Sequence, residues 1–284
     1  MKKRWKVFWI VCGITAGIGF ACCIAALALG VTVEMLENRF PNGIGIVSGN
    51  HGSESTSESY GGVQKIDMDL AAGEVIVLPS DNQETVVVET ENISRRLKFS
   101  TYMEGNELKI TSAKWLLFGE HIGKGKIYVY IPQNQTMEEV SLDMGAGNLT
   151  VENLWAKKFS LSVGAGDAEV WDFTAQEADF DCGTGKITAC GGASRGIDID
   201  CGVGDIEYTA YGNERDYNYD IDCGVGDVVI GANEYSGLGR SKNVNNGADR
   251  EISIDCGVGK VNVAFDSSRQ AAGPRMAARR TADF

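Results

Sequence analysis

Histidine and proline are scarce in this sequence of 284 residues, which contains two histidines and four prolines. Neither His51 nor His121 lies within the repeats described below, so a nucleophile activated by a histidine base has no place there. No CxxC motif occurs, and the cysteines and histidines form no cluster with zinc-ligand spacing. We therefore expect no enzymatic activity and no cofactor. A polysaccharide-cleaving β-helix with paired carboxylates is the least favoured alternative.

Basic residues are outnumbered, because 26 Lys and Arg stand against 39 Asp and Glu, a formal net charge of −13 at pH 7. The first 33 residues hold basic side chains and no acidic ones, so the remainder is more acidic still. Such a surface repels phosphate backbones, which argues against nucleic acid and favours a cationic or neutral partner. The segment DCGTGKIT is unlike a phosphate loop because Ile187 follows Lys186 where Ser or Thr is required. We expect no nucleotide binding.

Charged residues are absent from Val7 to Val33. As a helix this stretch would be roughly 40 Å long against a hydrocarbon core of about 30 Å, which predicts one transmembrane helix. Basic residues precede it and acidic residues follow it, so the positive-inside rule places the N-terminus in the cytoplasm and the rest of the chain outside. These residues are Lys2, Lys3, Arg4 and Lys6 before the stretch and Glu34 and Glu37 after it. Ala26-Leu27-Ala28 leaves a cleaved secretory signal open as the alternative.

Glycine is abundant, with 36 residues, and much of it falls in a twelve-residue unit that recurs along the chain. The unit has the form apolar-x-apolar-Asp-x-Gly-x-Gly-x-apolar-x-apolar, which predicts a strand, a corner and a second strand. Most copies recur every 19–22 residues, which predicts an all-β, β-helix-like solenoid after the transmembrane helix, with its coils stacked in chain order. The copies are VSLDMGAGNLTV, FSLSVGAGDAEV, ADFDCGTGKITA, IDIDCGVGDIEY, YDIDCGVGDVVI and ISIDCGVGKVNV, with IDMDLAAGEVIV as a weaker one.

Two glycines mark each predicted corner, because the chain there must adopt φ > 0 or approach the next coil closely. Ala71 replaces the first glycine in the weaker copy while the second is kept, so we expect the second position to be sterically tighter. The corner glycines of the other copies are Gly145, Gly147, Gly164, Gly166, Gly183, Gly185, Gly202, Gly204, Gly224, Gly226, Gly257 and Gly259.

Four cysteines share one inward position of the repeat, which Leu70, Met144 and Val163 fill in other copies. We interpret it as a packing position with reduced thiols; disulfides between neighbouring coils are the alternative. Aspartates at outward positions form rows, for which turn capping is the preferred role and calcium binding the weaker one. The cysteines are Cys182, Cys201, Cys223 and Cys256, and the weak calcium candidates are Asp200, Asp205, Asp222 and Asp227.

Composition divides the chain into four parts. Residues 1–33 are the basic start and the membrane anchor, and residues 34–62 form a flexible tether rich in Gly, Ser and Asn. Residues 63–265 are the β-solenoid domain, and residues 266–284 are a disordered tail. Within the domain, the polar stretch 231–250 interrupts the coil spacing, so we expect a long loop and a candidate binding element there.

The KIYVYIP strand and the LDMGAGNLTV, LSVGAGDAEV and IDCGVGDIEY units, with the basic start and single span, resemble a bacterial membrane-anchored family of unknown function named for adhesins with β-strand repeats. The resemblance covers about residues 63–265 and implies a stacked β fold at the cell envelope without catalytic residues. We expect a non-catalytic binding or scaffold module, with another envelope protein or a surface ligand as its partner. It could be a sensor or regulator of the envelope, or a surface adhesin.

Overall fold

The computed structural model describes residues 53–82, 84–113, 125–235 and 239–269. They belong to one of two compact units of the chain, the unit made of Asn50–Phe118 and Ile122–Phe284. The predicted transmembrane helix and most of the predicted tail lie outside the described residues. Within these ranges no helix is long and apolar enough to cross a membrane.

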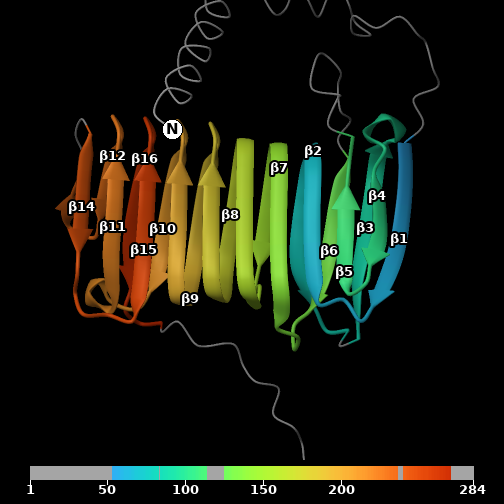
Figure 1. Ribbon diagram of the computed structural model, residues 1–284. Coiled ribbons are helices and arrows are strands. Elements are labelled where there is room, and N and C mark those ends of the chain that lie inside the picture. Colours follow the sequence, from blue (N-terminus) through green and yellow to red (C-terminus); the bar gives the residue numbers. More distant parts are fainter. Residues whose placement is uncertain (1–52, 83, 114–124, 236–238, 270–284) are drawn as a thin grey trace, which may run out of the picture. The chain divides into compact units, whose positions relative to one another are not determined.

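The described residues form an all-β solenoid, as the repeats predict (Figure 1). Each coil has an inbound arm leading to the Gly-x-Gly corner and an outbound arm leaving it, and the arms stack into an inbound and an outbound sheet. Four long strands run through a corner or the opposite turn and belong to both sheets: β2 (Lys65–Ser80), β7 (Met137–Glu152), β8 (Ala156–Cys182) and β9 (Lys186–Cys201).

The shorter strands each belong to one sheet. The inbound sheet contains β4 (Ser100–Glu104), β5 (Glu107–Thr111), β11 (Tyr217–Cys223), β14 (Arg240–Val244) and β15 (Arg250–Cys256). The outbound sheet contains β1 (Ser53–Gly61), β3 (Thr85–Ser94), β6 (Lys126–Pro132), β10 (Asp205–Tyr211), β12 (Asp227–Ile230), β13 (Asn233–Glu234) and β16 (Lys260–Asp266). Two short 3-10 helices, η1 (Arg95–Leu97) and η3 (Glu214–Asp216), lie in connections.

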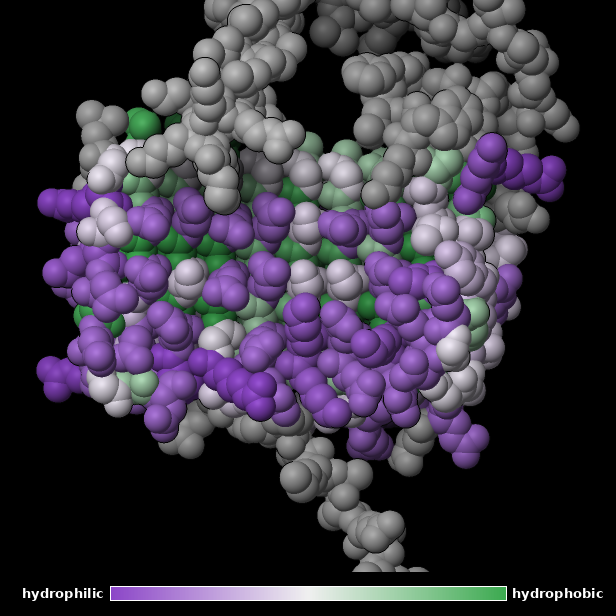
Figure 2. Space-filling model, viewed as in Figure 1, coloured by the Kyte–Doolittle hydropathy of each residue, from purple (hydrophilic) through white to green (hydrophobic). Residues whose placement is uncertain are grey.

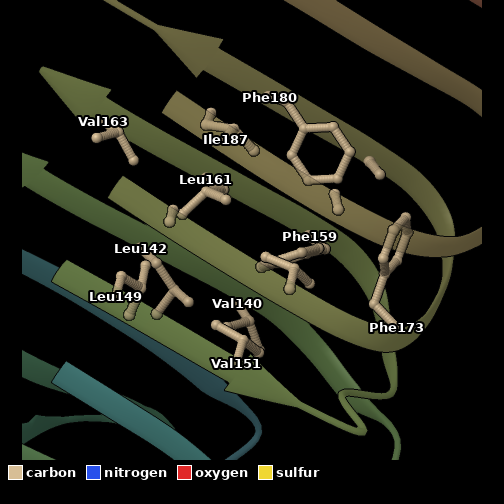
Figure 3. Packing of buried hydrophobic residues seen from close by; sticks show 14 of the residues in the cluster. Val140, Leu142, Leu149, Val151, Phe159, Leu161, Val163, Phe173, Phe180 and Ile187 are labelled. Carbon is tan, nitrogen blue, oxygen red and sulfur yellow. The ribbon is translucent and has the colours of Figure 1, made fainter. Parts of the chain in front are cut away.

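The core lies between the two arms of every coil, because side chains alternate between the two faces of a strand. Val140 and Leu142 from the inbound arm of β7 face Val151 and Leu149 from its outbound arm (Figure 3). In the next coils Phe159, Phe173 and Phe180 pack against one another with ring centroids 5.6–5.9 Å apart. No coil encloses these side chains alone, so the fold depends on stacking.

The order of the coils differs from the predicted chain order. β15 pairs in parallel with β9 on one side and with β11 on the other, and β16 likewise lies between β10 and β12 (Figure 1). The last coil is therefore inserted between the coil that ends in β10 and the coil of β11 and β12. The cysteine column accordingly runs Cys182, Cys201, Cys256, Cys223.

On the outbound sheet the insertion separates two like charges. In chain order Asp205 and Asp227 would be direct neighbours, whereas the inserted coil places Lys260 between them. Like charges directly opposite each other across strands destabilise a sheet, and opposite charges stabilise it. A similar inversion occurs at the other end of the stack, where β5 and β6 lie on one side of β2 and β7 lies on the other.

Two segments predicted to be irregular contain strands at the ends of the stack. Residues 53–61, assigned to the flexible tether, form β1, which pairs with β3. In the predicted loop 231–250, residues 240–244 form β14, which pairs with β11. Both strands are polar and lack the hydrophobic alternation of the repeats, because they lie at edges where few apolar side chains are needed. Charged edge strands also oppose end-to-end association of sheets.

Candidate binding face

The corner glycines lie directly above one another in successive coils. A Cβ on the first glycine would come within 2.5–2.9 Å of a neighbouring backbone oxygen. At every second glycine except Gly73, which has open space, a Cβ would overlap the carbonyl oxygen of the neighbouring second glycine. The second position therefore has less room. At Gly73, Gly147 and Gly166 φ is also positive, from +119° to +154°, whereas the second glycines of the later corners lie outside the left-handed region.

The later corners are closed by their cysteines, which are free thiols. Each thiol donates a hydrogen bond to the carbonyl oxygen three residues ahead, from Cys182 to Gly185 at 3.1 Å and from Cys201 to Gly204 at 3.0 Å. Cys223 and Cys256 repeat this bond. Burial raises the pKa of Cys201 to about 11 and that of Cys256 to about 12, so these thiols are protonated at neutral pH. They fill space and bond the corner.

The four calcium candidates lie on two different sheets. Asp200 and Asp222 are on the inbound sheet with Asp255 between them, and Asp205 and Asp227 are on the outbound sheet with Lys260 between them. The inserted coil thus separates both pairs. Among the described residues, no group of three or more His, Cys, Asp or Glu side chains is arranged to hold a metal ion.

The inbound sheet presents two parallel rows of acidic and hydroxyl side chains to solvent, visible across the strands in Figure 2. We call these two rows the Asp-Ser face. The row nearest the corners is Asp69, Asp143, Ser162, Asp181, Asp200, Asp255 and Asp222. The second row is Asp67, Ser141, Ser160, Asp179, Asp198, Ser253 and Asp220. Neighbouring strands are about 4.8 Å apart, and the two rows are separated by about 6.6 Å along a strand.

Most of these carboxylates have no partner of opposite charge. Asp67 pairs with Lys109 on β5, at the N-terminal end of the row. From β7 to β11 no carboxylate of the Asp-Ser face accepts a hydrogen bond or forms an ion pair among the described residues. Burial, followed by the neighbouring carboxylates, raises the pKa values of Asp179 and Asp200 above the usual range. The Asp-Ser face therefore presents neighbouring carboxylates that repel one another.

The adjacent rows are compensated. The next inbound row contains Lys65, which lies 3.0 Å from Glu139, and Lys158, which lies 3.6 Å from the same glutamate. The first outbound row is Lys126, Glu74, Asn148, Asp167, Lys186, Asp205, Lys260 and Asp227. The chain therefore places lysines among its acids in both neighbouring rows and leaves them out of the Asp-Ser face.

An open groove of ≈ 540 Å³ lies along the edge of the Asp-Ser face that is farther from the corners. It forms where Gly196 interrupts the compensated inbound row, between Glu177 on β8 and Glu251 on β15. Asp179 and Asp198 line it from the face, Lys158 lines it from the compensated row, and Arg195 also lines it and lies 3.3 Å from Glu177. The groove can accept a long side chain that lies along the face.

The sequence revealed the outward aspartates but not the groove. Asp143, Asp181, Asp200, Asp222 and Asp255 were recognisable as one row because they occupy the same position of the repeat. The gap at Gly196 depends on Glu251 being its spatial neighbour, although the two are far apart in the chain. The sequence signal for the order of the coils was the charge after each second glycine, which alternates from Asp167 to Asp227 only when the last coil is inserted.

Comparison with known proteins places the chain in a family. No curated protein matches it. Among solved structures, a candidate cell adhesion protein from Clostridium sporogenes is 17% identical with a TM-score of 0.42, and the match covers 75% of this chain and 100% of that one. A candidate adhesin from Bacteroides fragilis is 15% identical with a TM-score of 0.35, over 75% and 98% of the two chains. The family model Toastrack DUF4097 matches residues 63–230, more than half of the chain, and the chain therefore belongs to the Toastrack DUF4097 family.

Proposed function

We propose that this protein is a membrane-anchored, non-catalytic binding module of the cell envelope that uses its solenoid as a rigid surface for one partner. The span at Val7–Val33 and the basic residues before it support an anchor with the solenoid outside the membrane. The observation that carries the binding role is the Asp-Ser face. The protein places lysines among the acids of the neighbouring rows but none in the Asp-Ser face, and the repulsion between the carboxylates of this face costs stability.

Within this proposal, the short tether favours a sensor or regulator that binds a neighbouring envelope protein. A tether between residues 34 and 52 would have a root-mean-square reach of only about 25 Å, which keeps the solenoid close to the membrane. A surface adhesin would have to present its binding face much farther away.

Cross-linking in intact cells tests this function. The tagged full-length chain is cross-linked, solubilised in mild detergent and purified, and bound proteins are identified. We expect the purification to recover one envelope protein. In the same cells, we expect external protease to cleave the solenoid. Protection of the solenoid from external protease would refute the orientation. Turnover of a cell-wall polysaccharide by the purified chain, abolished by one carboxylate substitution that leaves stability unchanged, would refute the non-catalytic role.

A further inference from the structure

The Asp-Ser face has its strongest uncompensated charge in its C-terminal half. Asp179, Asp181, Asp198 and Asp200 occupy two adjacent coils, and Asp255, Asp220 and Asp222 continue the rows on the two coils that follow. Neither row contains a basic side chain over these coils; Lys158 and Arg195 line the groove beside the face, and Arg240 and Lys242 lie on β14, which pairs with β11. This sheet face is unpartnered within the described residues.

We infer that the Asp-Ser face docks a lysine- or arginine-rich segment of a partner protein. This rests on the proposed function, because it names the partner chemistry of the same surface. Charge complementarity carries the inference: cationic side chains of a partner would occupy the positions that Lys186 and Lys260 occupy in the compensated outbound row. Nucleic acids and anionic lipid surfaces carry the wrong sign of charge.

The spacing of the face suits flexible cationic side chains. Carboxylates repeat about every 4.8 Å across the strands and every 6.6 Å along them, so an ammonium or guanidinium group can lie between two or more of them. Ser162 and Ser253 interrupt the rows with hydroxyl groups that accept further hydrogen bonds from the same cations.

The groove provides the anchoring point. The gap at Gly196 lets the stem of a long side chain lie between Glu177 and Glu251, with its charged end near Asp198. Glu177 is already paired with Arg195, whereas Asp198 and Glu251 have no ion pair among the described residues. A lysine or arginine is long enough to bury its aliphatic stem there and expose its charge to these acids.

Docking would also relieve the repulsion within the face. Asp200 is surrounded by carboxylates on every side: Asp181 on β8 and Asp255 on β15 in its own row, and Asp198 on its own strand with Asp179 diagonal to it. Cations of a partner lower the energy of all these groups together. The attraction should therefore weaken with salt and with protonation of the face.

Peptide binding by the full-length chain in detergent tests the inference. The probe is a fluorescent peptide of alternating lysine and alanine, followed by fluorescence anisotropy at low and physiological salt. The face variant carries Asp179→Asn, Asp198→Asn, Asp200→Asn and Asp255→Asn. The matched control carries Asp167→Asn, Asp205→Asn, Asp227→Asn and Glu207→Gln on the outbound sheet, and so loses the same formal charge. We expect Kd to rise about tenfold in the face variant and less than about twofold in the control.

Equal weakening in both variants would overturn the inference, because net charge alone would then explain binding. Zero-length cross-linking of the peptide to the unmodified chain gives a readout that does not depend on the folding of any variant. Cross-links at Asp198, Asp200 or Glu251 support the inference, and cross-links confined to the outbound sheet refute it. A face that instead binds calcium, with a raised melting temperature and no peptide binding, also refutes it. Peptide binding without capture of an envelope protein in cells would uphold this chemistry and refute the proposed function.

Discussion

The first three corners of the solenoid and the last four are two solutions to the same turn. The first three follow Leu70, Met144 and Val163, have alanine between the two small residues, and keep the strand pairing continuous through the corner. The last four follow cysteine, carry threonine or valine in the middle, and bend at the corner. In the first group a left-handed glycine makes the turn, and in the second a thiol hydrogen bond closes it.

The residue before the first corner glycine therefore has two roles: it is an apolar core side chain in the first region and a hydrogen-bond donor to the corner in the second. Val163 and Cys182 occupy the same place in adjacent coils, and both are buried. The cysteine adds a bond to the corner and removes the need for positive φ at the second glycine. The middle residue is then free to be large, and Val203, Val225 and Val258 are each at least 60% exposed.

Cys201→Asp should have the largest effect, because it places a carboxylate at a position that is 2% exposed. We expect a loss of about 4 kcal/mol or more, enough to prevent folding. Cys201→Val is the control, since Val163 occupies the equivalent position, and it should cost about 1 kcal/mol through loss of the thiol bond. Chemical denaturation of residues 53–269 measures both. Equal stability of the two variants would show that the cysteine position is not a core position.

Gly204→Ala should destabilise the domain more than Gly202→Ala, by about 1 kcal/mol or more. A Cβ at position 204 overlaps the Gly185 carbonyl oxygen and comes within 2.6 Å of the Cys182 Sγ, whereas one at position 202 meets the Gly183 oxygen at 2.9 Å. Gly145→Ala extends the comparison to the first region, where the Ala71 oxygen lies at 2.5 Å, and should cost more than Gly202→Ala. Indistinguishable unfolding midpoints for these three variants would remove the steric distinction between corners.

Lys260→Asp tests why the last coil is inserted. It places three aspartates side by side after the corners of the second region, and we expect a loss of about 1 kcal/mol at low salt that shrinks at high salt. Asn148→Asp is the counterpart in the first region, because it lies between Glu74 and Asp167. Lys260→Gln should have the smaller effect. If the loss of stability in Lys260→Asp is the same at low and high salt, packing and not charge explains it.

Asp200→Asn should have the smallest effect, and its sign depends on pH. The folded state raises the pKa of Asp200, so ionisation costs stability, and that cost appears as pH rises from the ordinary value of 3.8 through the raised one. The variant should therefore melt slightly higher than the wild type at pH 7 and equally at a pH below 3.8. Asp143→Asn, with Asp69 and Ser162 as neighbours, should gain less. A destabilised Asp200→Asn variant at pH 7 would contradict the repulsion described for the face.

Local patterns predicted the arms and corners, because burial alternates along a strand whatever lies next to it. Ile252, Ile254 and Cys256 are buried as the repeat predicts, and Asp255 is exposed. Which coil lies beside which is a property of the whole stack, and near-identical IDCGVG segments fit one another in any order. At the surface the inserted coil differs from both neighbours at four outward positions, Glu251, Ser253, Lys260 and Asn262. The groove at Gly196 could not be predicted for the same reason, and β14 is too polar to show a strand pattern.

The inserted coil also determines how the solenoid responds to force. A terminal strand at the edge of a sheet can be peeled away one hydrogen bond at a time. β16 is instead held between β10 and β12, so tension applied beyond Arg269 shears two ladders at once. Arg269 adds a further attachment to Asp172 and Tyr211 on neighbouring coils. A pull at this end therefore loads two ladders together, whereas a pull on β1, at the edge of the outbound sheet, loads its ladder with β3.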